Sequence, residues 1–134
     1  MRLLLDTHIL IWSLTDDPRL SDKARGMILD EKNDIYFSSV SVWEVALKHS
    51  IHPDNVSFTG QDMARYCEEA GFEPLNLKND HVFALETIKR AADAPPHHDP
   101  FDRMLIAQAK AERMSFITHD PLLAGYGEKC VIMV

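Results

Sequence analysis

Short apolar runs and helical patterns alternate along this chain from one end to the other. Residues 2–5 form a short, mostly apolar run that stops at Asp6, which is typical of a strand buried on both faces. Pro74 lacks the amide hydrogen needed inside a sheet, so the strand that contains it is expected at an edge. Similar patterns predict four further strands, at residues 34–38, 72–77, 115–118 and 130–134.

Helical patterns fill the stretches between these strands. Ser21 is a suitable N-cap for one helix, and Gly71 is placed to end another. Strands and helices in alternation imply βαβ units, and therefore a parallel sheet with helices on both faces. The sequence thus predicts an α/β sandwich, in which ligands bind beyond the carboxyl ends of the strands. The expected helices span residues 9–14, 22–31, 41–49, 59–70, 79–90 and 100–113.

The composition fits one globular domain covering residues 1–134. The apolar share of 46% and the charged share of 26% are ordinary for such a domain. No stretch approaches the roughly 18 consecutive apolar residues of a membrane span, and the N-terminal apolar run is too short for a secretory signal. Cys67 and Cys130 are too few for a disulfide framework, so we expect two reduced thiols and a cytoplasmic protein.

The formal net charge of −7 argues at first against a nucleic-acid partner, because a phosphate backbone favours a positive surface. This objection weakens if several of the carboxylates bind metal. Two divalent cations add four positive charges, which would change −7 to −3, and they reverse the sign of the local field. Net charge therefore does not exclude a nucleic acid.

Two aspartates directly follow predicted strands. Asp6 comes after the first strand and Asp120 after the strand at 115–118, so both are expected at the carboxyl edge of the sheet. Each also has a plainer structural interpretation: Asp6 as the cap of the next helix, and Asp120 with Pro121 as a turn. Thr118, two residues before Asp120, has a hydroxyl able to orient a water or a phosphate oxygen.

Three further carboxylates lie near the starts of predicted helices. Ser41 and Glu44 match the S-x-x-E capping box, yet their helix follows the second strand, so the Glu44 carboxylate can also reach a cation at the sheet edge. Asp99 is expected to cap the helix that begins at Pro100. Asp102 leads a helix face that continues with apolar residues. A carboxylate there is costly unless it is paired or metal-bound, so Asp102 is expected to be a ligand.

Carboxylates that converge at one sheet edge repel each other at neutral pH unless protons or cations occupy the site. Hard oxygen ligands without cysteine suit Mg²⁺, with Mn²⁺ as a plausible substitute. A pair of such ions activates a water and stabilises the departing oxygen of a phosphodiester, without any histidine. The carboxylates predicted to hold metal for this chemistry are Asp6, Glu44, Asp102 and Asp120.

At these residues the chain resembles the PIN-domain family, and within it the VapC-type toxins of type II toxin–antitoxin pairs. The resemblance implies a PIN-like α/β/α sandwich with a central, mostly parallel sheet of four to five strands. It also implies a Mg²⁺-dependent endoribonuclease with Asp6, Glu44, Asp102 and Asp120 as its acidic centre, accompanied by Asp99. The matching motifs occur in the family's order and span nearly the whole chain: Asp6-Thr7-His8-Ile9-Leu10-Ile11-Trp12, Ser41-Val42-Trp43-Glu44 with Lys48, Asp99-Pro100-Phe101-Asp102-Arg103 with Ala107-Gln108-Ala109, and Thr118-His119-Asp120.

The resemblance also implies partners and supporting residues. For this chain it implies a homodimer, an RNA substrate and a cognate antitoxin that blocks the acidic groove, often with an arginine inserted toward the metals. Thr7, Thr118 and Arg103 are candidates for contacting the substrate or supporting the acidic residues, and Arg103 would hold an acidic neighbour or a phosphate. Asp102 is preferred over Asp99 as the metal ligand because it stands at the usual interval before the small-residue helix pattern.

The histidines and aromatic residues offer rival interpretations. A zinc site would draw on the seven histidines, but no H-x-x-x-H spacing is present, and His97 and His98 are expected to line the loop at the mouth of the cleft. Base stacking is conceivable for three aromatic residues, but core packing is their expected role: Trp12, Trp43 and Phe101.

Two other function classes compete with a toxin ribonuclease. One is a Mg²⁺-dependent nuclease or phosphotransfer domain outside a toxin–antitoxin pair. A receiver module would need an acidic pair in the first loop, and a haloacid-type phosphatase a D-x-D motif, where this chain has Asp6-Thr7-His8. The other is a binding module that keeps only the fold, which predicts gaps in the acidic set, and no gap is present.

Overall fold

A five-stranded sheet forms the middle layer of the protein, which the computed structural model describes over residues 1–134. The strand order is β3-β2-β1-β4-β5, and all four neighbouring pairs are parallel. The predicted α/β class and the parallel sheet are therefore confirmed. The strands are β1 (Arg2–Leu5), β2 (Asp34–Ser38), β3 (Glu73–Leu75), β4 (Ser115–Thr118) and β5 (Val131–Met133).

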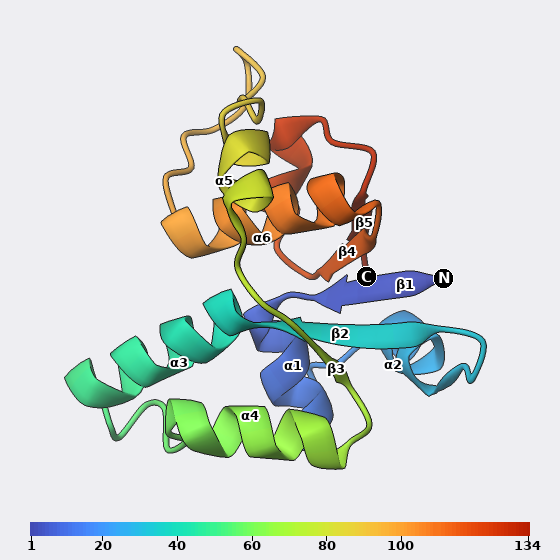
Figure 1. The fold of residues 1–134 in the computed structure, drawn as a ribbon, viewed down its shortest axis with the longest axis vertical. Helices are drawn as coiled ribbons and strands as arrows, with labels where there is room; N and C mark the ends of the chain where they lie inside the picture. The colour runs from blue at the N-terminus through green and yellow to red at the C-terminus, as the bar shows by residue number, and fades with distance from the viewer.

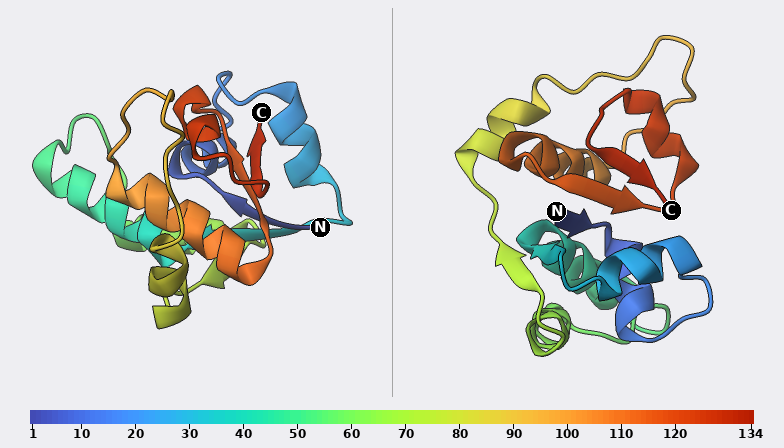
Figure 2. Two further views of the ribbon diagram at one scale, coloured as in Figure 1. Left: turned by 90° about the horizontal axis from the view of Figure 1, so that it is seen from above. Right: turned by 90° about the vertical axis from the view of Figure 1, so that its right-hand side faces the viewer.

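Helices cover both faces of the sheet (Figure 1). Figure 2 shows the sheet lying between the two helix layers when the molecule is turned. One layer holds α1 (Thr7–Leu14), α2 (Asp22–Leu29), α3 (Ser39–Ile51) and α4 (Gly60–Glu69). The other holds α5 (Asn79–Leu85), α6 (Pro100–Glu112) and the 3₁₀ helix η1 (Pro121–Tyr126). None of the helices is long and apolar enough to span a membrane.

The central strand β1 supplies side chains to two separate hydrophobic cores. Leu3 and Leu5 pack into the core beneath α1–α4, whereas Leu4 packs into the core beneath α5, α6 and η1. All three leucines are fully buried. Alternate side chains of a strand point to opposite faces, so an unbroken apolar run is what a strand covered on both sides requires. The prediction for residues 2–5 is confirmed.

Two predicted elements end earlier in the structure than the sequence pattern indicates. The helix expected at 79–90 stops at Leu85, because the next three amides bond to carbonyls only three residues back and turn the chain. This turn buries Ile88 in the second core. The strand expected at 72–77 is only three residues long, but its edge position and its Pro74 agree with the prediction.

The carboxyl ends of β1, β2 and β4 meet at one edge of the sheet. There β1 leads into α1, β2 into α3, and β4 into η1, a helix that the sequence analysis did not predict. In a parallel sheet this edge is where ligands bind, because the chain leaves each strand there and carries side chains into a shared crevice.

Candidate metal centre

Asp6 is buried at the carboxyl end of β1 and is held by two hydrogen bonds. Its Oδ1 accepts a bond of 2.7 Å from the Thr7 amide, and its Oδ2 accepts one of 2.7 Å from the Thr118 hydroxyl. The first bond makes Asp6 the N-cap of α1, as the plainer interpretation of this residue predicts. Burial raises the pKa of Asp6, which indicates that an unneutralised charge at this position is unfavourable.

Thr118 connects two of the predicted site residues. Its hydroxyl donates to Asp6 and accepts a bond of 3.1 Å from the Asp120 amide. Asp120 itself caps η1, since its Oδ1 accepts a bond of 2.9 Å from the Leu122 amide. The hydroxyl proton of Thr118 is therefore already used to orient Asp6, whereas the sequence analysis assigned it to a water or a phosphate oxygen.

Glu44 is 2% exposed and lies in the second turn of α3. The predicted capping box is wrong, because α3 begins two residues earlier and its N-cap is Ser38, whose Oγ accepts a bond of 2.9 Å from the Val40 amide. Ser41 instead accepts a bond of 2.9 Å from the Thr7 hydroxyl. The Glu44 side chain therefore does not cap the start of α3.

The two oxygens of Glu44 have different surroundings. Oε2 accepts a bond of 2.5 Å from Nζ of Lys48, one helical turn further on. Oε1 is buried and has no hydrogen-bond partner. A buried carboxylate oxygen without a partner is costly, so this atom indicates that a cation or a water belongs beside it.

Asp99 and Asp102 lie three residues apart at the start of α6 but have different partners. Asp99 is the N-cap, as predicted, and its Oδ1 accepts bonds of 2.9 and 3.3 Å from the amides of Phe101 and Asp102. The Asp102 carboxylate makes no cap bond, and its Oδ2 lies 3.2 Å from Nε2 of His97. Asp102 is accordingly the freer of the two to bind a cation.

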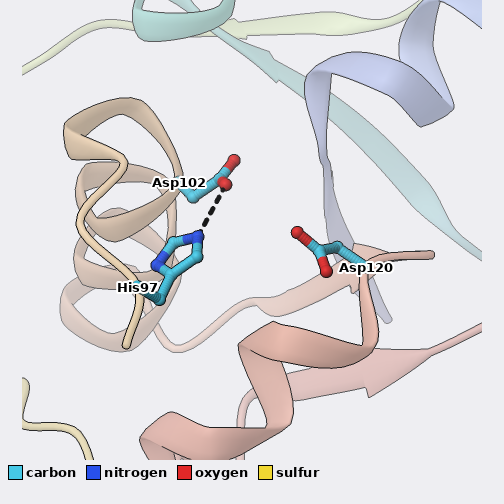
Figure 3. A group of neighbouring side chains, drawn as sticks. All are labelled: His97, Asp102 and Asp120. Atoms are coloured by element: carbon cyan, nitrogen blue, oxygen red, sulfur yellow. Dashed lines mark hydrogen bonds and ion pairs between the residues drawn. The ribbon is translucent and has the colours of Figure 1, made fainter. Parts of the chain in front are cut away.

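His97 is a residue of this site that the sequence analysis placed only at the mouth of the cleft. Its side chain is 6% exposed, and its Nδ1 lies 2.6 Å from the Tyr126 hydroxyl. In Figure 3 the His97 ring points at Asp102, and the Asp120 carboxylate faces both from the start of η1. One ligand atom from each of these three residues lies within 4.8 Å of the others. No motif indicates this arrangement, because it depends on how the loop before α6 folds back.

The acidic residues influence one another electrostatically. The pKa of Asp102 rises to about 8, chiefly because of burial and then because of its neighbours Asp6, Asp99, Glu44 and Asp120. Without a cation, Asp102 therefore holds a proton at neutral pH. The other four selected carboxylates are thus close enough to influence Asp102, and ligand atoms of Asp102 and Asp120 lie within 4.8 Å of each other, whereas Asp99 caps α6.

Two predictions about neighbouring side chains need correction. Arg103 forms no ion pair and so holds no acidic neighbour, whereas its contact with a phosphate stays a prediction. Core packing is right for Trp12, which belongs to the first core, but wrong for Trp43, which is 57% exposed and touches Phe101 edge-on with 4.7 Å between ring centroids.

The donor set fits a hard divalent cation. The grouped ligand atoms are carboxylate oxygens of Asp102 and Asp120 and an imidazole nitrogen of His97, and the buried Oε1 of Glu44, which has no partner, is a further oxygen near Asp102. Oxygen donors of this kind suit Mg²⁺ and Mn²⁺. A metal ion bound here would take the place of the proton on Asp102.

Comparison with known proteins identifies the family. Residues 3–129 match the PIN domain family. Among solved structures, VapBC2 from Rickettsia felis bound to a promoter DNA fragment has a TM-score of 0.69 at 14% identity, over 100% of this chain and 98% of that chain. A toxin–antitoxin complex from Klebsiella pneumoniae has a TM-score of 0.59 at 21% identity, over 98% and 96% of the two chains. FitAcB from Neisseria gonorrhoeae has a TM-score of 0.56 at 19% identity, over 88% and 87%.

These structural likenesses are below 25% identity and establish the fold alone. No curated protein matches the sequence. The family match, however, covers nearly the whole chain and includes all five carboxylates. The chain belongs to the PIN-domain family.

Proposed function

We propose that this PIN-domain protein is a Mg²⁺-dependent endoribonuclease and the toxin of a toxin–antitoxin pair, with residues 1–134 as one nuclease domain. PIN domains are nucleases, so the family supports phosphodiester hydrolysis. The observation that carries the proposal is the buried Oε1 of Glu44, which has no partner in a site where Asp6 and Asp102 both have raised pKa values. Cations bound at this edge of the sheet would neutralise these carboxylates.

The residues proposed to hold metal are Asp6, Glu44, Asp102 and Asp120. When bound, divalent ions of this kind activate a water and stabilise the charge that develops on a phosphodiester. The remaining residues act on these ligands: Thr118 orients Asp6, Lys48 holds one oxygen of Glu44, and the ring of His97 lies against Asp102. Such supporting contacts fix the direction of ligand oxygens and tune their affinity for metal.

The assignment as a toxin is supported by what solved proteins of similar fold bind. The solved relatives include a toxin–antitoxin complex, and the motifs of this chain resemble VapC-type toxins. Exposed apolar side chains recur at four-residue intervals along α3, at Trp43, Leu47 and Ile51. Such a stripe suits a protein partner, either an antitoxin segment or a second copy of the chain in a homodimer. The two unpaired cysteines fit the cytoplasm, where thiols stay reduced.

Incubating the purified protein with total RNA and Mg²⁺, with and without chelator, tests the nuclease function. We expect cleavage that chelator abolishes and that Asp6→Asn lowers by at least about a hundredfold. Asp80→Asn, at an exposed aspartate of α5, is the matched control and should cleave normally. Cleavage that resists chelator, or full activity in Asp6→Asn, would count decisively against the proposal.

The neighbouring reading frame separates a toxin from a PIN-domain nuclease with another role. A short gene directly upstream that encodes a DNA-binding protein is expected for a toxin–antitoxin pair. Co-expression of that gene product should suppress RNA cleavage by this chain. Absence of any such gene would leave a metal-dependent nuclease but remove the toxin assignment.

A further inference from the structure

A pocket of about 350 Å³ opens beside the acidic residues. Asp6 and Asp120 line it together with four side chains that have no part in holding metal: His8, Trp12, Arg19 and His119. Its volume lies in the range of small-ligand sites. One arginine and two imidazoles thus lie next to the two carboxylates, in a chain with a net charge of −7.

Flat rings line this pocket. Trp12 is buried in the first core, and its ring centroid lies 5.9 Å from that of His8 and 5.6 Å from that of His119. His8 and His119 are exposed, and Trp12 lies against both imidazoles from the buried side. Nδ1 of His119 also donates to the Val134 carbonyl at 2.7 Å, which fixes that ring. Exposed rings of this kind stack with unpaired bases.

The guanidinium of Arg19, which is hydrogen-bonded to the chain, also lines the pocket. Arg19 lies 5.2 Å from the ring centroid of Trp12, and its Nε and Nη2 donate to the Asp17 carboxylate at 3.1 and 2.8 Å. Nη1 donates to no group of the chain, so its hydrogens are free. An arginine that is already oriented binds phosphate oxygens with little loss of side-chain freedom.

We propose that this pocket, here called the His8–Arg19 pocket, binds one unpaired nucleotide beside the phosphodiester that is cleaved. The base stacks on His8 and His119, and its phosphate bonds to Arg19. The position beside the cleaved bond rests on the proposed nuclease function, whereas nucleotide binding itself does not. A base inside a duplex cannot enter the pocket, so the nucleotide that binds must be unpaired.

Nucleoside 5′-monophosphates test this binding without cleavage, because they contain no phosphodiester. The chain has two tryptophans, so Trp43→Phe leaves Trp12 as the only tryptophan, whose emission is selected by excitation above the tyrosine absorption. Titration with AMP or UMP is expected to quench Trp12 emission and to shift the imidazole NMR signals of His8 and His119. The nucleoside alone and inorganic phosphate alone should each bind more weakly than the nucleotide.

Substitutions distinguish a loss of nucleotide binding in the pocket from a general effect on the fold. We expect His8→Ala and Arg19→Ala each to weaken nucleotide binding by about fivefold to tenfold, and His8→Phe, which keeps a flat ring, to retain it. Arg65→Ala is the matched control. Arg65 also pairs with an aspartate, Asp62, and lies 5.2 Å from the ring centroid of Tyr66, but it does not line the pocket.

Three results would overturn the proposal: Trp12 emission that no mononucleotide changes, equal losses in Arg19→Ala and Arg65→Ala, or inorganic phosphate that binds as tightly as the nucleotide. RNA cleavage is measured in the same variants. Nucleotide binding without metal-dependent cleavage supports the pocket and rejects the nuclease function. Metal-dependent cleavage with unchanged KM in His8→Ala and Arg19→Ala rejects the pocket and keeps the nuclease function.

Discussion

Glu44 places one carboxylate oxygen against Lys48 and leaves the other buried without a partner. The lysine holds the side chain in one orientation, and that orientation directs Oε1 away from any donor of the chain. Such an atom is stable only if a bound species satisfies it. At the scale of single residues, this atom supports a cation or a water bound beside Glu44.

Glu44→Gln tests this interpretation without changing the size of the side chain. We expect the affinity for Mn²⁺ to fall by at least about tenfold, which corresponds to roughly 1.4 kcal/mol, because a neutral amide oxygen is a weaker ligand than a carboxylate. Isothermal titration calorimetry measures the change. The control Glu31→Gln, at an exposed position, should bind as the wild type does. Equal affinities in wild type and Glu44→Gln would remove Glu44 from the metal site.

Asp102 predicts how metal binding depends on pH. In the metal-free protein its pKa is raised to about 8 by burial and neighbouring carboxylates, so its neutral form stabilises the fold at low pH, and that contribution is lost as the pH rises through about 8. A cation must displace this proton. Mn²⁺ affinity should therefore rise from about pH 6 to about pH 8, by up to about tenfold per pH unit.

Calorimetric titrations across this range measure the pH dependence, and buffers of different ionisation enthalpy report the proton released. Asp102→Asn is the control, since it has no proton to lose and should bind weakly with a flatter profile. Wild-type affinity that stays constant over the range would contradict the raised pKa of Asp102.

At the scale of elements, Arg90 links the loop before α6 to η1 by hydrogen bonds. Arg90 donates to the carbonyl of Leu122 at 2.6 Å and to that of Pro95 at 2.7 Å, and it lies 4.6 Å from the ring centroid of Tyr126. A Cβ at Gly125 would come within 2.7 Å of this guanidinium, so a larger residue there would require the Arg90 side chain to shift. These contacts hold His97 against Asp102.

Tyr126→Phe is expected to loosen this arrangement while it preserves the ring. The change removes the hydroxyl that lies 2.6 Å from Nδ1 of His97, so the imidazole loses its orienting partner. We expect a loss of about 1 kcal/mol in the free energy of unfolding, measured in urea, and about tenfold weaker Mn²⁺ binding. Tyr66→Phe on α4, in the other helix layer, should leave metal binding unchanged. If both variants bind Mn²⁺ equally, Tyr126 and His97 do not position Asp102.

For the whole molecule, the negative charge of the site opposes folding until a cation neutralises it. The chain carries a net charge of −7, and its carboxylates at the sheet edge raise the pKa of Asp102. A ligand that binds only the folded state stabilises it in proportion to the logarithm of its concentration. Metal should therefore act on global stability as well as on activity.

Mg²⁺ at a hundredfold excess over its Kd is expected to raise the free energy of unfolding by about 2.7 kcal/mol. The corresponding rise in Tm is roughly 5 to 10 °C, and chelator should reverse it. Differential scanning calorimetry gives the measurement. Asp6→Asn should raise the Tm of the metal-free protein, because one buried charge is gone, and should lose most of the response to Mg²⁺. A Tm that is insensitive to Mg²⁺ in the wild type would exclude a metal site of this kind.

Local sequence patterns were sufficient for most of the architecture. Leu3–Leu5 predicted a strand buried on both faces, Ser21 and Asp99 were recognised as helix caps, and Pro74 marked an edge strand. Each of these features depends on the conformational and hydrogen-bonding preferences of a few adjacent residues. Such preferences can be read along the chain without knowledge of distant contacts.

The sequence by itself determined that Asp6 and Asp120 lie at the carboxyl edge of the sheet, because each directly follows a parallel strand. Only the tertiary structure decided what surrounds them. Ser38 rather than Ser41 caps α3, Thr118 donates to Asp6, and the ring of His97 lies against Asp102. These contacts join residues from separate elements or across a folded loop, and their free energy depends on burial and packing that no local pattern encodes.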